Sequence, residues 1–234
     1  MDEMNYFNQV AEKGVDTKVV NKVMRNVYFK MCMAMLVSAV TAMHVSTDQA
    51  ILEFVFGKPA VLIGLVIAQV AVVIVMSSML SKLGKGVATV LFLLYSILTG
   101  VTLSTVLLVY TSSSVAYTFF ITAVVFAVMC VYGYITENDL SKFGSIMFMA
   151  LIGLIICAVV NIFMKSVMMD WIISFAGVII FIGLTAWDTQ AIKRMIASSS
   201  EDSWDKIATI GALNLYLDFV NLFLYLLRFF GGRR

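Results

Sequence analysis

Residues 144–164 read GSIMFMALIGLIICAVVNIFM and contain no formally charged side chain. As a helix, this run would be about 30 Å long, which matches the thickness of the hydrocarbon core of a bilayer. Further uncharged runs of similar length cover about 60–80, 87–109, 115–136 and 171–187. They predict helices, because a transmembrane barrel would need alternating strands of about ten residues, and the sequence shows no such alternation.

Two more apolar runs, at about 27–46 and 209–230, contain a few ionisable side chains. With them, the sequence predicts an all-α polytopic membrane protein with seven transmembrane helices. The composition agrees, since 62% of the residues are hydrophobic and only 13% are charged, against about 25% charged residues in soluble domains. The net charge of +2 is too small to indicate a nucleic-acid partner.

The predicted organisation is one membrane domain with short ends. An N-terminal tail covers residues 1–26, the seven-helix domain covers 27–230, and a short basic C-terminal tail covers 231–234. With seven crossings, ten lysines and arginines lie on the side of the N-terminus and five on the other side. Because positively charged loops remain in the cytoplasm, we expect the N-terminus to be cytoplasmic.

Two aspartates, Asp188 at the end of the sixth predicted helix and Asp218 about two and a half turns inside the last, enter the membrane from the same side at similar depth. The linker of about 20 residues allows these helices to pack antiparallel. Two adjacent carboxylates cannot both ionise cheaply, so the pair would titrate as a unit that shares one proton. For Asp188, the alternative is an interfacial cap or a salt bridge to Lys193 or Arg194.

The last apolar run also contains a stripe of polar residues. Its members recur at intervals of three and four residues, which places them on one helix face: Asn214, Asp218, Asn221, Tyr225 and Arg228. Such a stripe belongs inside a helix bundle, where it would face protein or a water path. The alternative is that the two asparagine amides only hydrogen-bond neighbouring helices.

The remaining polar residues within the runs suggest structural roles. Lys30 is expected to extend to the nearby headgroups and His44 to lie at the opposite interface. The sequence contains no Ser-His-Asp set, HExxH motif, phosphate-binding glycine loop or CxxC motif. We therefore expect neither an enzyme nor a cofactor.

Four motifs, in order along the chain, are similar to those of the Bax inhibitor family, also called the transmembrane Bax inhibitor motif family. They are YSILTGVTLS (95–104), YGYITENDLS (132–141), GLTAWDTQ (183–190) and LYLDFVNLFL (215–224). The similarity runs from about residue 20 to the end, and the motif order resembles the bacterial inner-membrane branch.

The resemblance implies a seven-helix fold in which the last helix is central and is wrapped by the other six. It also implies a pH-sensitive calcium leak whose sensor is a pair of aspartates, and Asp188 and Asp218 occupy the matching motif positions. In some relatives a charged residue of the second helix engages the pair. The corresponding run here offers only Gln69, Ser77 and Ser78.

The expected function is therefore a calcium leak in the bacterial inner membrane, gated by Asp188 and Asp218, which would also form a weak, transient calcium site. The polar stripe would line its path. The alternative is a regulatory membrane protein that conducts nothing and modulates a membrane-bound protease through its cytoplasmic tail and the loop at 198–204.

Overall fold

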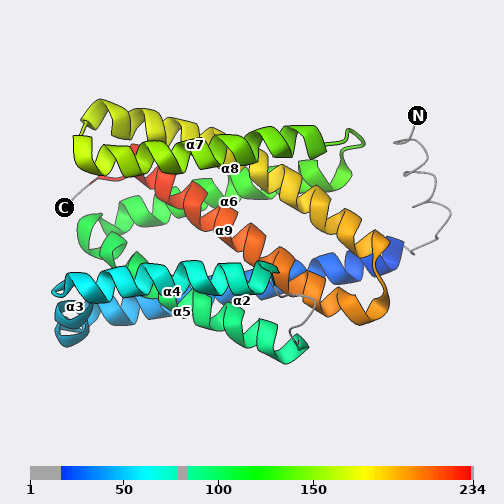
Figure 1. The fold of residues 1–234 in the computed structure, drawn as a ribbon, viewed down its shortest axis with the longest axis horizontal. Coiled ribbons are helices and arrows are strands. Elements are labelled where there is room, and N and C mark those ends of the chain that lie inside the picture. Colours follow the sequence, from blue (N-terminus) through cyan, green and yellow to red (C-terminus); the bar gives the residue numbers. More distant parts are fainter. Residues whose placement is uncertain (1–16, 79–83, 233–234) are drawn as a thin grey trace.

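The computed structural model describes residues 17–78 and 84–232, and almost all of them are helical (Figure 1). Seven helices are long and apolar enough to cross a membrane, which confirms the predicted all-α membrane fold. They are α2 (Thr17–Thr47), α4 (Pro59–Ser78), α5 (Lys85–Val109), α6 (Ser112–Ile135), α7 (Ser141–Met164), α8 (Val167–Ser198) and α9 (Trp204–Phe230). A short helix, α3 (Gln49–Phe56), follows α2, and a 3-10 turn, η1 (Glu201–Ser203), precedes α9.

Two helices extend well beyond the predicted apolar runs. α2 begins at Thr17 instead of residue 27, and α8 continues past residue 187 to Ser198. Both extensions are amphipathic and mix charged residues with buried apolar ones such as Val23 and Ile192, so a search for uncharged runs does not detect them. The predicted boundary between tail and membrane domain therefore falls inside α2. Residues 1–16 of the tail and the two arginines at 233–234 lie outside the described residues.

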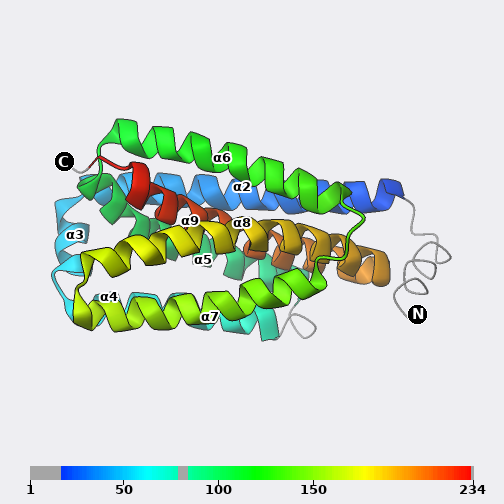
Figure 2. The same cartoon turned by 90° about the horizontal axis from the view of Figure 1, so that it is seen from above.

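α9 is the central helix of the bundle. Fifteen of its 27 residues are buried, whereas Met76 is the one buried residue of α4. Its main neighbours are α2, α5, α6 and α8, while α4 packs mainly on α5 and α7 mainly on α8. Figures 1 and 2 show α9 in the interior in two perpendicular views. Four helices, rather than the expected six, thus form the principal contacts around it.

α9 is a single unbroken helix of 27 residues, about 40 Å long, which is enough to cross a bilayer once. The start of α2 and the end of α9 lie at opposite ends of the bundle (Figure 1). At that far end the C-terminal backbone is tied to the start of α6, since Gly232 donates from its N–H to the Ser114 hydroxyl at 2.9 Å. The arrangement agrees with an odd number of crossings.

Candidate functional site

The structure brings Asp188 of α8 and Asp218 of α9 together. The two helices are consecutive, antiparallel and closely packed, and the carboxyl groups lie within hydrogen-bonding reach of each other. Asp218 is 4% exposed and is the one charged residue in the buried core of residues 17–78 and 84–232. Its Oδ2 atom has no hydrogen-bond partner. A buried carboxylate with an unsatisfied oxygen is costly, which marks this position as a functional candidate.

The surroundings of the aspartate pair come from three helices. Tyr28 of α2 places its hydroxyl beside the Cys130 thiol of α6 and the Thr189 hydroxyl of α8. Cys130 in turn lies within electrostatic range of Asp218. These neighbours are neutral, weakly polar groups. They offer no positive charge to stabilise a second ionised carboxylate.

The alternative interpretation of Asp188, a salt bridge to a base in the following turns, does not match the structure. Lys193 donates to the backbone carbonyl of Tyr134 at 2.9 Å and lies over the Tyr134 ring. Arg194 pairs with Asp139 and donates to the Ser141 hydroxyl at 2.6 Å. Both bases thus bind α6 and the loop after it.

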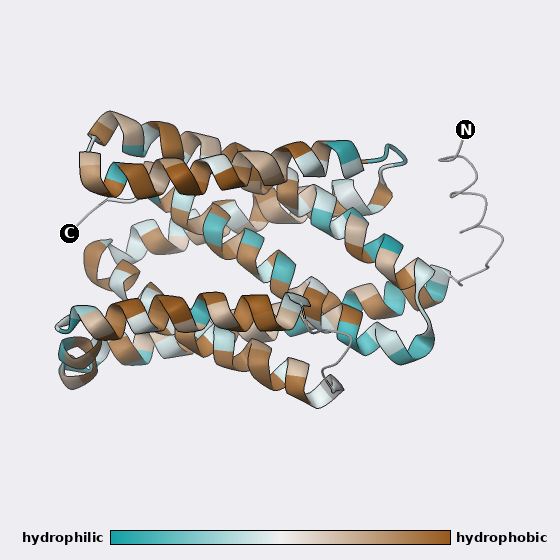
Figure 3. Cartoon of the chain, viewed as in Figure 1, coloured by the Kyte–Doolittle hydropathy of each residue, from teal (hydrophilic) through white to brown (hydrophobic). Residues whose placement is uncertain are grey.

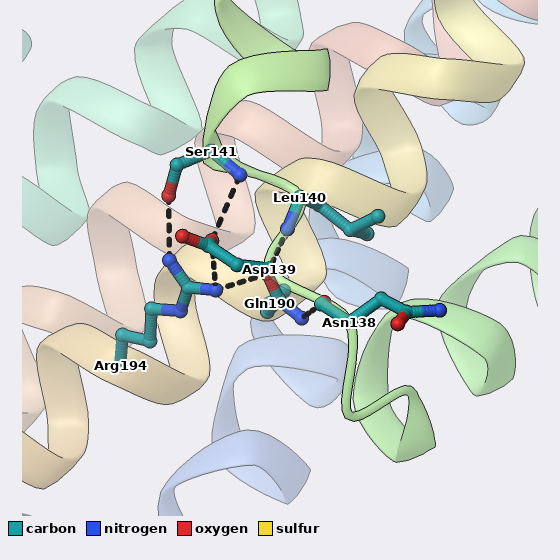
Figure 4. A network of polar contacts seen from close by, with 6 residues as sticks. All are labelled: Asn138, Asp139, Leu140, Ser141, Gln190 and Arg194. Atoms are coloured by element: carbon teal, nitrogen blue, oxygen red, sulfur yellow. Dashed lines mark hydrogen bonds and ion pairs between the residues drawn. The ribbon is translucent and has the colours of Figure 1, made fainter. Parts of the chain in front are cut away.

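These contacts belong to a polar network that joins α8 to the loop between α6 and α7 (Figure 4). The Gln190 side chain accepts from the Leu140 N–H at 2.9 Å and donates to the Asn138 carbonyl at 2.8 Å. Partial burial of Asp139 disfavours its ionised form, but hydrogen bonds from Ser141 and Arg194 outweigh it and hold its pKa below the ordinary value. The network fixes α8 just beyond Asp188.

The predicted polar stripe of α9 divides into separate environments rather than one continuous face. Figure 3 shows hydrophilic residues along the middle of α9. Asn221 donates to the Leu217 carbonyl of its own helix at 2.8 Å, and Asn214 is half-buried. Tyr225 stacks on Phe181 and its ring lies directly against Gly177. The Tyr225 ring is therefore packed against α8.

Arg228, the last member of the stripe, is exposed and lies over the Tyr225 ring. It borders a cavity of about 410 Å³ together with Lys165, Asn161 and Asp170. Asn161 donates to Asp170 at 2.7 Å. Two bases and one acid give this far end of the stripe a positive balance, which does not favour a cation.

Lys30 does not simply extend to the headgroups as expected. Its ammonium group pairs with Asp205 at 2.7 Å and donates to the Thr209 hydroxyl at 2.8 Å, so it ties α2 to the start of α9. Sequence reasoning missed this pair because the partners are 175 residues apart. It also missed Tyr28, Cys130 and Thr189, which carry no motif signal of their own.

The aspartate pair has too few ligands for a stable metal site. Within the described ranges, no group of three or more His, Cys, Asp and Glu side chains gathers as metal ligands would. Calcium in stable protein sites takes six to eight oxygen ligands. Two carboxylates alone therefore do not make a stable calcium site.

Known proteins resemble this chain over nearly its whole length. The family model described as inhibitor of apoptosis-promoting Bax1 matches residues 20–234. Inner membrane protein YbhL of Escherichia coli K12 is 49% identical over 214 residues, covering 90% of this chain and 92% of that protein. A Borreliella burgdorferi protein is 44% identical over 227 residues (96% and 98%), and RP147 of Rickettsia prowazekii is 39% identical over 228 residues (97% and 94%). The chain therefore belongs to the Bax inhibitor family.

Proposed function

We propose that this membrane protein is a pH-sensitive calcium leak, without enzymatic activity, in which Asp188 and Asp218 form the gate. The observation that carries the proposal is the placement of two carboxyl groups against each other between α8 and α9, with Asp218 buried. Their neighbours Tyr28, Cys130 and Thr189 supply no compensating cation. The protonation of the pair therefore controls the local electrostatics.

At acidic pH, the two carboxyl groups share one proton. A hydrogen bond between a carboxylic acid and a carboxylate is charge-assisted and strong, so it holds α8 and α9 together. α8 is itself fixed to the α6–α7 loop through Gln190 and Arg194. In the closed state, α9 is thus held against α8, which is itself anchored to the α6–α7 loop.

At higher pH, the pair loses the shared proton and both carboxylates are ionised. Two unit charges at 4 Å repel by about 4 kcal/mol at an effective dielectric constant of 20. That energy is sufficient to shift a closed state toward an open one. α9 would then move relative to α8, and the Tyr225 ring would leave its contact with Phe181 and Gly177.

Calcium suits this path because it prefers carboxylate, carbonyl and water oxygens and tolerates irregular coordination. Such oxygens would come from the carboxylates of Asp188 and Asp218 and from the side-chain amides of Asn214 and Asn221, one after another along the path. The positive balance around Arg228 implies that the ion leaves the stripe before Arg228 or that this side chain swings away.

We place the protein in the bacterial inner membrane with a cytoplasmic N-terminus. The name of the YbhL relative, an inner membrane protein, supports the first statement. The excess of basic residues on the side of the N-terminus supports the second. In this orientation, the proton is sensed from the cytoplasmic half of the membrane.

The proposal is tested by calcium flux into liposomes that contain the purified protein, measured between pH 6 and pH 8. The wild type should conduct more at pH 8 than at pH 6. Asp218→Asn should lose this pH dependence, while Asp202→Asn, the same substitution in the exposed turn η1, should retain it.

If Asp218→Asn keeps both the flux and its pH dependence, the gating proposal is wrong. If the wild type conducts no calcium at any pH and instead co-purifies with a membrane-bound protease, the non-conducting regulatory function replaces it.

A further inference from the structure

A groove runs between α2 and α6 on the flank of the bundle, and Phe219 of α9 also lines it. The groove encloses about 660 Å³, within the usual range for ligand pockets. Its walls are mostly apolar: Met24, Met31, Met35, Phe119, Phe126 and Phe219. Exposed Cys32, Ala127 and Val131 form part of its lining, so it opens on the surface that faces lipid.

The polar residues of the groove lie at one end. Asn21 and Arg25 of α2 and Tyr134 of α6 line it near the start of α2, where the Tyr134 hydroxyl donates to the Asn21 side chain. From Asn21 to Met35 the groove follows about 21 Å of helix. One leaflet with its headgroup layer is about 20–22 Å thick. The groove therefore has the length and the polarity gradient of one phospholipid.

The charge at the polar end favours an anionic headgroup. Arg25 lines the groove, and Lys193, outside the lining, lies over the ring of the lining residue Tyr134 with its ammonium group 4.9 Å from the ring centre. Arg25 also borders a second cavity that contains Asp205 and Glu201. Asp205 is already paired with Lys30 at 2.7 Å. Among the described residues that line the groove, the one formal charge is thus the positive charge of Arg25, at the end where the phosphate would lie.

We propose that the α2–α6 groove binds one anionic phospholipid from the leaflet that contains the start of α2. An acyl chain lies along the methionine and phenylalanine walls, and the headgroup phosphate accepts from Arg25. The same walls include Tyr28 and Cys130, and Cys130 lies within electrostatic range of Asp218, so the lipid would border the surroundings of the aspartate pair. Binding of this lipid does not depend on whether the protein conducts calcium.

The test is native mass spectrometry of the full-length protein after equilibration with phosphatidylglycerol or phosphatidylcholine. The wild type should retain one phosphatidylglycerol molecule in preference to phosphatidylcholine. Arg25→Gln should weaken this retention about fivefold, the effect of one arginine at an anionic lipid surface. Lys142→Gln, the same loss of charge at an exposed position of α7 outside the groove, should leave it unchanged.

A second pair of variants tests the acyl-chain part of the groove. Ala127→Trp places an indole in the groove and should reduce retention of phosphatidylglycerol to the level of phosphatidylcholine. Val128→Trp, on the neighbouring exposed position of α6 outside the groove, should not. Because both side chains are exposed, neither change requires the core to repack.

The proposal is overturned if the two charge variants lose the lipid equally, because diffuse surface charge then explains the retention. It is also overturned if the wild type holds both lipids equally well, or if Ala127→Trp binds phosphatidylglycerol as the wild type does.

Discussion

α4 and α9 are both long enough to cross a membrane, but they occupy opposite places in the bundle. α4 is strongly apolar and lies at the periphery, where Met76 is its single buried residue. α9 is less apolar and contains Asp218, yet more than half of it is buried. In this protein, the more polar of the two helices is the inner one.

The reason is that lipid replaces water as the outer solvent. A lipid-facing side chain must be apolar, whereas an inner helix can find hydrogen-bond partners on its neighbours. α9 does so through Tyr216, whose hydroxyl is 2.6 Å from the Ser38 hydroxyl of α2. Polarity within an apolar run thus indicates the interior of the bundle, and the following predictions test that difference.

The largest difference in stability between an inner and an outer helix is expected for a glycine-to-alanine substitution. A methyl group at Gly133 of α6 would collide with the backbone of Ala186 in α8, so Gly133→Ala should destabilise the fold by about 3 kcal/mol. At Gly64 of α4 an added Cβ meets no atom within 4 Å, and Gly64→Ala should leave stability unchanged. Thermal unfolding in detergent micelles measures both variants. Equal stability of the two would mean that α6 and α8 are not in close contact.

A cavity in the core should have the next largest effect. Leu222 of α9 is fully buried, and Leu222→Ala should cost about 2 kcal/mol, the low end for buried leucine because lipid provides no hydrophobic driving force. Ile67 of α4 is 62% exposed, and Ile67→Ala should change the melting temperature little. A larger loss at Ile67 than at Leu222 would reverse the assignment of inner and outer helices.

Loss of a hydrogen bond between helices should have the third largest effect on stability. Ser38 donates to the Ser96 carbonyl at 2.7 Å and also contacts Tyr216, so Ser38→Ala should cost about 1 kcal/mol. Gln69 of α4 donates to Thr102 at 3.1 Å and is partly buried. Gln69→Leu should reduce the free energy of unfolding by less than Ser38→Ala, because an apolar leucine is well solvated by lipid. The unfolding temperatures of the Ser38→Ala and Gln69→Leu variants, measured in the same micelles, show which of the two hydrogen bonds contributes more.

The smallest effect concerns Asp139 at the surface. Its pKa is lower in the folded protein than in the unfolded chain, so its contribution to stability is present above about pH 4 and disappears as the pH falls further. The stability advantage of the wild type over Asp139→Asn should therefore shrink on acidification from pH 5 to about pH 3. An advantage that is constant over this range would indicate that Asp139 contributes through shape alone.

The sequence was sufficient for the seven crossings, since uncharged runs of bilayer length have no other stable environment. It also singled out Asp188, just after one such run, and Asp218, inside the last apolar run, and their helices do pack against each other. Their role as a gate stays a prediction. It could not assign the helix ends at Thr17 and Ser198, which depend on polar contacts outside the membrane.

Contacts between distant segments were the main part that sequence reasoning missed. The Lys30–Asp205 pair and the shell of Tyr28, Cys130 and Thr189 around the aspartates depend on which helix faces rotate toward each other. Helix α3 was missed as well, although Asp48 provides a capping signal by accepting from the N–H groups of Ala50 and Ile51.

The central claim is that Asp188 and Asp218 share one proton when the protein is closed. Infrared difference spectroscopy of the protein in lipid, between pH 6 and pH 8, detects this proton through the carbonyl stretch of a protonated carboxyl group. The account predicts one such group at pH 6 that is lost at pH 8 and is missing from the Asp188→Asn, Asp218→Asn double variant. If both carboxylates are already ionised at pH 6, or if the double variant retains the signal, the aspartate pair is not the gate.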